Sequence, residues 1–305
     1  MTVSDPAKSS GTPVGTPAAD LHVETAVVRA LLREQHPDLA ELPLRRLEAG
    51  WDNQLFRLGD RLAVRLPRRT ASAGLVMHEQ RWLGLLAGQL PLPIPAPLRV
   101  GEPGQGFPWP WSVIPWFAGV PAFQEAPSQG EGRVLACFLR ALHVEPPADA
   151  PTNPYRGVPL STRASVIEER LARLAQMPIV TPEVRANWER ALASPVDVAP
   201  TWIHGDLHVL NVLVDNGRLS AVIDWGDMAR GDPATDLASI WMLLPTRALR
   251  AEAIDAYGPS SAATWARARG WVVAFATMML DAGLAGDARF AAMGERALQH
   301  LADGP

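Results

Sequence analysis

The sequence lacks several features that define whole classes of proteins. Cys137 is the only cysteine among the 305 residues, so no internal disulfide can form. The lack of cysteine pairs weakly favours a reducing compartment such as the cytoplasm. A net charge of −4 and an isoelectric point of about 6.0 provide no basic field for nucleic acid. We therefore expect no disulfide framework and no nucleic-acid partner, and we expect Cys137 to be a small buried hydrophobe.

Long apolar runs and targeting signals are also lacking. The longest predominantly apolar run lies around Trp271 to Leu280 and is too short for a bilayer span, which needs roughly 20 residues. The N-terminus has no cationic segment followed by an apolar core, the pattern of a secretion signal. We therefore expect a soluble cytoplasmic protein, monomeric or dimeric, without a membrane partner.

Composition divides the chain into three parts. Residues 1–19 are mainly Ser, Thr, Pro, Gly and Ala, and they predict a disordered tail because they can bury too little surface to offset their ordering entropy. Residues 20–117 predict a small lobe built from an antiparallel sheet with one helix, and residues 118–305 predict a larger, mainly helical lobe. The predicted fold class is therefore α+β.

Local patterns place the elements of both lobes. Helical spacing begins near Leu21, and the turn dipeptide Gly59-Asp60 joins two predicted strands. Further along the chain, Ser128 to Glu131 has the pattern of a capping box, and Thr181-Pro182 and Asp232-Pro233 each combine a cap with a first-turn proline. The predicted strands are 42–48, 54–58, 61–66, 97–100 and 110–116, and the predicted helices include 72–87, 182–191, 234–243, 247–257, 262–282 and 287–301.

One stretch carries most of the chemistry. The letters HGDLHVLN, which end at Asn211, and the letters IDW around Asp224 place two carboxylates and an amide on loops bounded by β-rich segments. Phosphoryl transfer from a metal-bound nucleotide needs these groups. Asp206 would orient the acceptor hydroxyl and take its proton, while Asn211 and Asp224 would hold Mg²⁺, which prefers hard oxygen ligands.

Each of these residues also has a purely structural explanation. An Asp that follows Gly often serves as a turn residue, Asn211 can simply start a strand, and Asp224 can end one while it accepts backbone donors. A hairpin predicted at Asn216-Gly217 would bring Asn211 and Asp224 close together. We therefore favour catalysis and metal binding for the set as a whole.

The spacing H-G-D-x-x-x-x-N, followed by a strand and then I-D-W, resembles the aminoglycoside phosphotransferase family, a branch of the protein-kinase-like fold. The resemblance covers residues 44 to about 244. It implies a bilobal fold, with a small antiparallel β-sheet lobe that binds nucleotide and a larger helical lobe that carries catalysis and substrate. It also implies Mg²⁺-dependent transfer of a γ-phosphoryl group from ATP or GTP to a hydroxyl of a small molecule.

Three further residues near the catalytic segment have two interpretations each. His204 would orient the loop backbone through hydrogen bonds or take part in proton transfer, and we favour the first because Asp206 already supplies the base. His208 would contact a phosphate or be a solvated loop histidine. Asp236 matches a family position that braces the catalytic loop. Alternatively, Asp236 is simply an acidic residue in the first turn of a helix, where the helix dipole favours a negative charge.

The nucleotide side depends on Arg65 and Glu79. Arg65 lies on the third strand, where kinase-like folds place a phosphate-contacting Lys, and Arg is a departure because its planar charge differs from a compact ammonium. The stretch RLPRR that begins at Arg65 is similar to one in macrolide phosphotransferases. Glu79 is the helix partner expected for Arg65. The alternatives are a solvent-facing Arg65 and a surface Glu79 that pairs with Arg81.

Two other segments are candidates for nucleotide contact. The sequence has only Gly50 between the first two strands, where a phosphate loop would normally have several glycines. Gly50 would leave backbone N–H groups free to bind a phosphate, and Asn53 would donate a hydrogen bond to a phosphate oxygen. A simple hairpin turn explains these residues almost as well. The stretch Ser112 to Gly119 would be a hinge that offers backbone groups to the base, with Trp116 either beside the base or packed in the core.

The acceptor is the least determined part. Asp227, Asp281 and Glu125 would hold ammonium groups, with solvent as the alternative for Asp227, whereas the apolar segment from Trp271 to Asp281 would line a macrolactone pocket or form a core helix. The RLPRR stretch favours an aminoglycoside- or macrolide-type antibiotic as the acceptor.

Two alternative functions remain. One is a kinase of an amino alcohol, homoserine or sugar, and the other is a nucleotide-binding pseudokinase that regulates a partner. A protein kinase is disfavoured because no Ala-Pro-Glu segment is recognisable.

Overall fold

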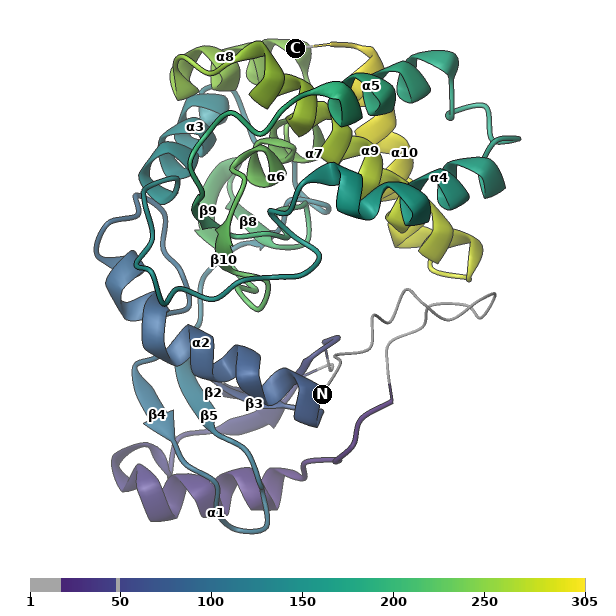
Figure 1. Cartoon of the computed structure of the whole chain (residues 1–305). Helices are drawn as coiled ribbons and strands as arrows, with labels where there is room; N and C mark the ends of the chain where they lie inside the picture. Colours follow the sequence, from purple (N-terminus) through teal and green to yellow (C-terminus); the bar gives the residue numbers. More distant parts are fainter. Residues whose placement is uncertain (1–17, 48–49, 305) are drawn as a thin grey trace. The chain divides into compact units, whose positions relative to one another are not determined.

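The chain forms two compact units (Figure 1). The computed structural model describes residues 18–47 and 50–304, so most of the predicted tail, 1–19, lies outside the described residues. Unit 1 comprises the described parts of 18–89 and 93–118, and unit 2 comprises 90–92 and 119–304. The assignment of these units to nucleotide binding and to catalysis stays a prediction.

Unit 1 is built on a five-stranded antiparallel sheet with the order β1-β2-β3-β5-β4. Its strands are β1 (Leu44–Arg46), β2 (Asn53–Leu58), β3 (Leu62–Pro67), β4 (Arg99–Gly101) and β5 (Trp111–Pro115). Gly59, with φ of +56°, turns the chain between β2 and β3, which is the predicted turn. All five predicted strands are confirmed, although the predicted end at Glu48 lies outside the described residues.

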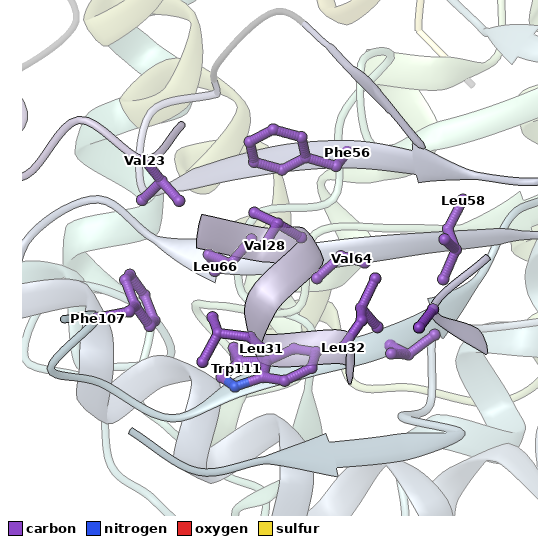
Figure 2. Close-up of a cluster of buried hydrophobic side chains, with 12 residues drawn as sticks. Val23, Val28, Leu31, Leu32, Phe56, Leu58, Val64, Leu66, Phe107 and Trp111 are labelled. Atoms are coloured by element: carbon purple, nitrogen blue, oxygen red, sulfur yellow. The ribbon is translucent and has the colours of Figure 1, made fainter. Parts of the chain in front are cut away.

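Helix α1 (Thr25–Gln35) covers one face of this sheet. Its buried residues Val28, Leu31 and Leu32 share one side of the helix because they are three and four positions apart. They pack in one cluster with alternate residues of β2 and β3, which point to the same face of the sheet because side chains alternate along a strand. Figure 2 labels the sheet residues Phe56, Leu58, Val64, Leu66 and Trp111 of this cluster, to which Val113 of β5 also belongs.

Helix α2 (Thr70–Ala87) lies on the opposite face. Arg65 stands between Val64 and Leu66 on β3, so its side chain points away from α1, and it pairs with Glu79 of α2. Among the described residues, unit 1 therefore has two α-helices where the sequence predicts a sheet with one. The additional helix is α1, which the helical spacing near Leu21 indicates, and the 3₁₀ helix η2 (Pro37–Leu39) follows it.

Unit 2 is mainly helical and is organised around α9, which packs against α10 and α5. The apolar run Trp271 to Leu280 belongs to α9 and is largely buried. The prediction of a core helix is therefore confirmed, and the alternative of a macrolactone pocket is not supported. Within the described ranges, none of the helices combines the length and apolarity needed to cross a membrane. The helices are α3 (Glu131–Leu142), η3 (Leu160–Arg163), α4 (Ala164–Arg173), α5 (Pro182–Ala193), α6 (Ala234–Leu237), α7 (Ser239–Leu243), α8 (Arg247–Tyr257), α9 (Ala262–Leu284) and α10 (Ala288–Ala302).

The predicted helix caps have mixed outcomes. The Thr181 hydroxyl accepts the Val184 N–H at 3.3 Å, so this cap is confirmed. The capping box at Ser128 is wrong, because Gly130 occupies the N-cap with φ of +92° and the Glu131 carboxylate instead accepts the Leu219 N–H at 2.9 Å. The Glu131 carboxylate therefore binds a backbone N–H from a distant part of the chain instead of the local N–H that a capping box would use.

Two small sheets of unit 2 position the loops that carry the chemistry. β7 (Thr201–Ile203) pairs with β10 (Ala229–Gly231), and β8 (Val212–Asp215) pairs with β9 (Arg218–Val222) and with β6 (Val120–Pro121). Asn216 and Gly217 join β8 to β9 with φ of +52° and +78°, as a two-residue hairpin turn of positive φ requires. The predicted hairpin is confirmed.

Cys137 is exposed, so the prediction of a buried hydrophobe is wrong. Helix α3 turns one stripe inward, formed by Leu135, Phe138, Leu139 and Leu142. Position 137 lies outside that stripe, and its exposure follows from the helical period.

Candidate active site

The strand ends bring the sequence motif together. His204, Gly205 and Asp206 follow β7 directly, and Asn211 precedes β8. The carbonyl of Asn211 accepts the Ile223 N–H at 2.8 Å, which continues the β8–β9 pairing by one step. Asn211 and Asp224 therefore lie at the same end of this hairpin.

Both carboxylate oxygens of Asp206 face hydrogen-bond donors. Oδ1 lies 3.2 Å from a guanidinium nitrogen of Arg156, and Oδ2 lies 3.3 Å from Nε2 of His208 and 3.4 Å from Nδ2 of Asn211. Burial raises the pKa of Asp206, but the interactions with His208, Arg156 and His204 outweigh burial and hold that pKa well below its ordinary value. Asp206 is therefore ionised at neutral pH.

His204 is fully buried and uses both ring nitrogens for the backbone. Its Nδ1 accepts the Asp206 N–H at 3.2 Å, so Nε2 carries the hydrogen and donates it to the Ile223 carbonyl at 3.0 Å. The ring also packs on Trp225, with 4.8 Å between centroids. This geometry favours the structural role predicted for His204 over proton transfer.

Asp236 holds the turn that presents Asp206. Its Oδ2 accepts the His204 N–H at 2.6 Å, and its Oδ1 accepts the Gly205 N–H at 2.8 Å. Gly205 has φ of +84°, and a Cβ there would come within 2.6 Å of the Asp227 carbonyl oxygen, so the turn requires glycine. These contacts are the bracing arrangement predicted for Asp236.

His143 and Tyr257 extend this brace, and the sequence analysis does not identify them. His143 Nε2 lies 3.5 Å from Oδ2 of Asp236, and His143 Nδ1 lies 2.9 Å from the Tyr257 hydroxyl. His143 follows α3, Asp236 lies on α6 and Tyr257 ends α8, so no local spacing connects the three residues.

His208 is buried, so the solvated-histidine interpretation is wrong. Its Nδ1 accepts the Leu210 N–H at 3.2 Å, which leaves Nε2 as the nitrogen that carries a hydrogen and faces Asp206. His208 thus helps to fix the predicted catalytic carboxylate.

Asn211 and Asp224 fit a small divalent cation. Asn211 directs its amide nitrogen to Asp206, which turns its Oδ1 away as an oxygen ligand. Asp224 is exposed and has φ of +61°, a left-handed conformation that costs energy outside glycine and often marks functional sites. Within the described residues no three His, Cys, Asp or Glu side chains cluster as metal ligands. A two-oxygen site suits Mg²⁺, which keeps several waters.

Asp227 is joined to Asp206 through Arg156. Arg156 Nε lies 3.9 Å from Asp227 Oδ2, and Asn153 donates to Asp227 Oδ1 at 2.7 Å. Burial raises the pKa of Asp227, and the negative fields of Asp206 and Asp224 add to the rise against the opposing effects of Arg156 and Asn153. Arg156 and Asn153 are further site residues that the sequence analysis does not identify.

The other two acidic candidates have partners of their own. Asp281 lies 2.7 Å from Arg173 and 3.7 Å from Arg170, and a Glu125 oxygen accepts the Gly217 N–H. We therefore do not carry Asp281 or Glu125 forward as ammonium-binding residues, because two arginines pair with Asp281 and a backbone N–H occupies Glu125.

In unit 1, Arg65 and Glu79 form the predicted ion pair. The two side chains are 2.9 Å apart, and the residues are 5% and 4% exposed, so the solvent-facing alternatives for both are wrong. With its amide oxygen directed at Arg65, Asn53 accepts two hydrogen bonds from the guanidinium at 2.8 and 3.1 Å. Asn53 thus orients Arg65, a role different from the predicted phosphate donor.

Gly50 differs from its predicted role, whereas the predicted place of Trp116 beside the base stays a prediction. The Gly50 N–H donates to the Asn53 carbonyl at 2.9 Å, so it closes a turn and is not directed at a phosphate. Trp116 is 41% exposed, with the Arg57 guanidinium 4.3 Å from its ring centroid, so the core-packing alternative is wrong.

Comparison with known proteins supports these observations. A sequence profile described as the phosphotransferase enzyme family matches residues 43–271. Aminoglycoside 3′-phosphotransferases of Escherichia coli and Salmonella typhimurium are each 30% identical over 146 residues, which cover 44% of this chain and 52% of theirs. The chain thus matches about half the length of these relatives.

Solved structures extend the comparison to the fold. The GDP complex of aminoglycoside 2′-phosphotransferase-IIIa has a TM-score of 0.66 at 19% identity and covers 93% of this chain and 100% of its own. Apo macrolide 2′-phosphotransferase MphH from Brachybacterium faecium has a TM-score of 0.56 at 24% identity and covers 88% and 97%. The predicted α+β, kinase-like fold is confirmed. Because the profile match extends over well more than half of its residues, this chain belongs to the phosphotransferase enzyme family.

Proposed function

We propose that this protein transfers the γ-phosphoryl group of ATP or GTP to a hydroxyl group of an aminoglycoside- or macrolide-type antibiotic, and that it does so in the cytoplasm. The observation that carries the proposal is the gathering of Asp206, Asn211 and Asp224 around the loop that Asp236 braces. The family membership supports phosphoryl transfer. The GDP and ADP complexes of related phosphotransferases support a nucleotide as the donor.

Asp206 acts on the acceptor. Its ionised carboxylate accepts a hydrogen bond from the attacking hydroxyl and aligns it with the phosphorus atom. The transition state of phosphoryl transfer is loose, so alignment matters more than a strong base, and a carboxylate with a lowered pKa suits this task. The hydroxyl proton passes to Asp206 as the new oxygen–phosphorus bond forms, and the bond from the γ-phosphorus to the bridging oxygen breaks to release ADP or GDP.

Candidate donor-binding residues occur in each unit, two in unit 2 and one in unit 1. Asn211 and Asp224 would hold Mg²⁺, and the bound ion supplies charge neutralisation on the phosphate oxygens. Arg65, oriented by Glu79 and Asn53, would contact the phosphates as a fixed cation.

The test is a substrate panel. Purified protein is incubated with Mg²⁺ and ATP or GTP together with aminoglycosides, macrolides and amino alcohols, and each acceptor is examined by mass spectrometry for an added phosphate. We expect a phosphorylated antibiotic with the parent chain and none with Asp206→Asn. Tight nucleotide binding without any phosphorylated acceptor would instead support the regulatory pseudokinase.

A further inference from the structure

A guanidinium lies against the predicted catalytic carboxylate. We propose that Arg156 positions Asp206 for transfer and selects against acceptors that carry clustered ammonium groups. The proposal depends on the function proposed above, and it narrows the acceptor to an uncharged or singly charged hydroxyl compound.

The loop that carries Arg156 is constructed to deliver this side chain. The Asn153 side-chain oxygen accepts the N–H groups of Tyr155 and Arg156 at 2.8 and 3.1 Å, which forms a tight turn. The next residue, Gly157, donates its N–H to the Thr235 hydroxyl at 3.1 Å, and its carbonyl accepts the Asp232 N–H at 2.9 Å. Arg156 therefore stands between two anchored residues.

Close packing of Gly157 against two neighbouring strands fixes the position of this loop. Gly157 has φ of +65°, and a Cβ there would lie 2.5 Å from the Ile203 side chain and 2.8 Å from the Cα of Gly231. The loop backbone thus touches β7 and β10, the two strands that set the position of the catalytic loop. Arg156 and Asp206 share one rigid support.

The Arg156 side chain is also held along its length. Its guanidinium lies 4.9 Å above the ring of Phe275 on α9, and the side chain is 15% exposed. From there it reaches Oδ1 of Asp206 at 3.2 Å and Oδ2 of Asp227 at 3.9 Å. Because His208 and Asn211 take the other oxygen of Asp206, the carboxylate plane is set by donors on both sides.

The same arrangement decides which acceptors are tolerated. A polycation needs uncompensated carboxylates around the reacting hydroxyl, but Asp227 already faces Arg156 and Asn153. Asp281 and Glu125 are likewise occupied by partners within the fold. An ammonium group brought to Asp206 would instead meet a fixed guanidinium, and like charges in a partly buried site repel.

The experiment compares Arg156→Gln and Arg156→Lys with the parent chain. Arg133→Gln is the matched control, since it removes the same charge from a side chain that is 65% exposed on α3. Steady-state kinetics uses a macrolide with one amino group and the polycation kanamycin, and calorimetry measures the Kd of kanamycin for each protein. Circular dichroism and thermal unfolding confirm that each variant is folded.

We expect the parent to prefer the macrolide. Arg156→Gln should lower kcat for the macrolide by about 100-fold while KM changes by less than about threefold, because alignment is lost and ground-state binding is kept. It should also tighten kanamycin binding by about tenfold. Arg156→Lys should recover only part of kcat, since it lacks the planar fork, but it should still exclude kanamycin because the charge remains.

The proposal is overturned if Arg156→Gln lowers kcat no more than Arg133→Gln does, or if kanamycin binds Arg156→Gln no more tightly than it binds the parent. If the parent phosphorylates no acceptor at all, the proposed function fails, and the calorimetric comparison by itself then decides the charge selection. If Arg156→Gln does not fold, Arg156→Lys takes its place. An unchanged kcat for the macrolide, or tighter kanamycin binding than in the parent, then overturns the proposal.

Discussion

In the proposed mechanism, Asp206 must satisfy two opposing demands. It has to stay ionised to accept the hydroxyl hydrogen bond, and it has to stand in one orientation although it is partly buried. Donors on both carboxylate oxygens meet both demands, since they offset the desolvation that burial imposes and they also restrict rotation of the side chain. The neighbours of Asp206 are therefore part of its chemistry.

Replacing this carboxylate by an amide tests its role directly. Asp206→Asn keeps the size of the side chain and should lower kcat by about 10³-fold, because an amide cannot take the hydroxyl proton. The affinity for Mg²⁺-nucleotide should stay within about threefold. Product formation and calorimetry measure the two quantities, and a turnover within about tenfold of the parent would contradict the assignment.

The metal assignment depends on Asp224. Asp224→Ala removes the carboxylate at a position of positive φ two residues past β9, and it should abolish the part of ATP affinity that depends on Mg²⁺. Calorimetric titrations with and without Mg²⁺ give this difference, and Asp215→Ala at the other, exposed end of the hairpin is the control. An equal Mg²⁺ effect in both variants would remove Asp224 from the metal site.

At the scale of elements, unit 2 builds its catalytic loop by connecting distant parts of the chain. One buried residue of α6, Asp236, satisfies two backbone donors that follow β7. Buried N–H groups are costly when they lose their acceptor, so the loop and the helix depend on each other.

Removing this brace should lower the stability of unit 2. Asp236→Ala leaves the His204 and Gly205 N–H groups without their acceptor, and we expect a loss of about 2–5 kcal/mol in the free energy of unfolding. Urea unfolding measures it, with Thr181→Ala as the reference for a lost helix cap at about 1 kcal/mol. A loss no larger than that of the cap would argue against the brace.

In unit 1, strand β3 and helix α2 are connected by one buried ion pair. Arg65→Glu or Glu79→Arg alone should cost about 3–5 kcal/mol in the free energy of unfolding, because a buried charge then faces a like charge. The double reversal should recover at least about 1 kcal/mol of the summed losses. Urea unfolding of the four proteins forms the cycle, and strictly additive losses would mean that the two residues do not interact.

At the scale of the whole molecule, the chain uses arginine almost alone as its strong cation. Its single lysine, Lys8, lies outside the described residues. Guanidinium groups therefore make the contacts to Asp206, Glu79, Asp232 and Asp281. Arginine keeps its charge when buried and can address two acceptors at once, which suits the partly buried pairs of this fold.

Stability at high pH should depend on Tyr257. Burial raises the pKa of Tyr257 to about 12, and the negative fields of Asp236 and Asp232 add to the rise. The folded chain thus keeps a proton that the unfolded chain releases near pH 10, so stability should fall as pH rises from about 10 to 12, by at most about 1.4 kcal/mol per pH unit. Unfolding midpoints across this range measure the fall. Tyr257→Phe should show a smaller one, and an equal slope in both proteins would contradict the assignment.

Features that depend on a few neighbouring residues follow from the sequence. The Asn216-Gly217 turn needs positive φ at both positions, and the helix at 247–257 follows from its spacing, so both were predictable. The burial of individual side chains was harder to predict from the sequence. Cys137 was expected inside and His208 was left open, because the environment of a side chain depends on elements that pack against it from elsewhere.

The order of strands and helices and the motif from His204 to Asp224 were determined by the amino-acid sequence itself, because turn chemistry, side-chain periodicity and residue spacing act over short distances along the chain. Only the tertiary structure decided what surrounds Asp206. Arg156 stands 50 positions away along the chain, and His143, the residue that follows α3, lies 3.5 Å from Asp236. Such pairs form when separate elements pack together, and that packing reflects the sum of many weak contacts which no local pattern records.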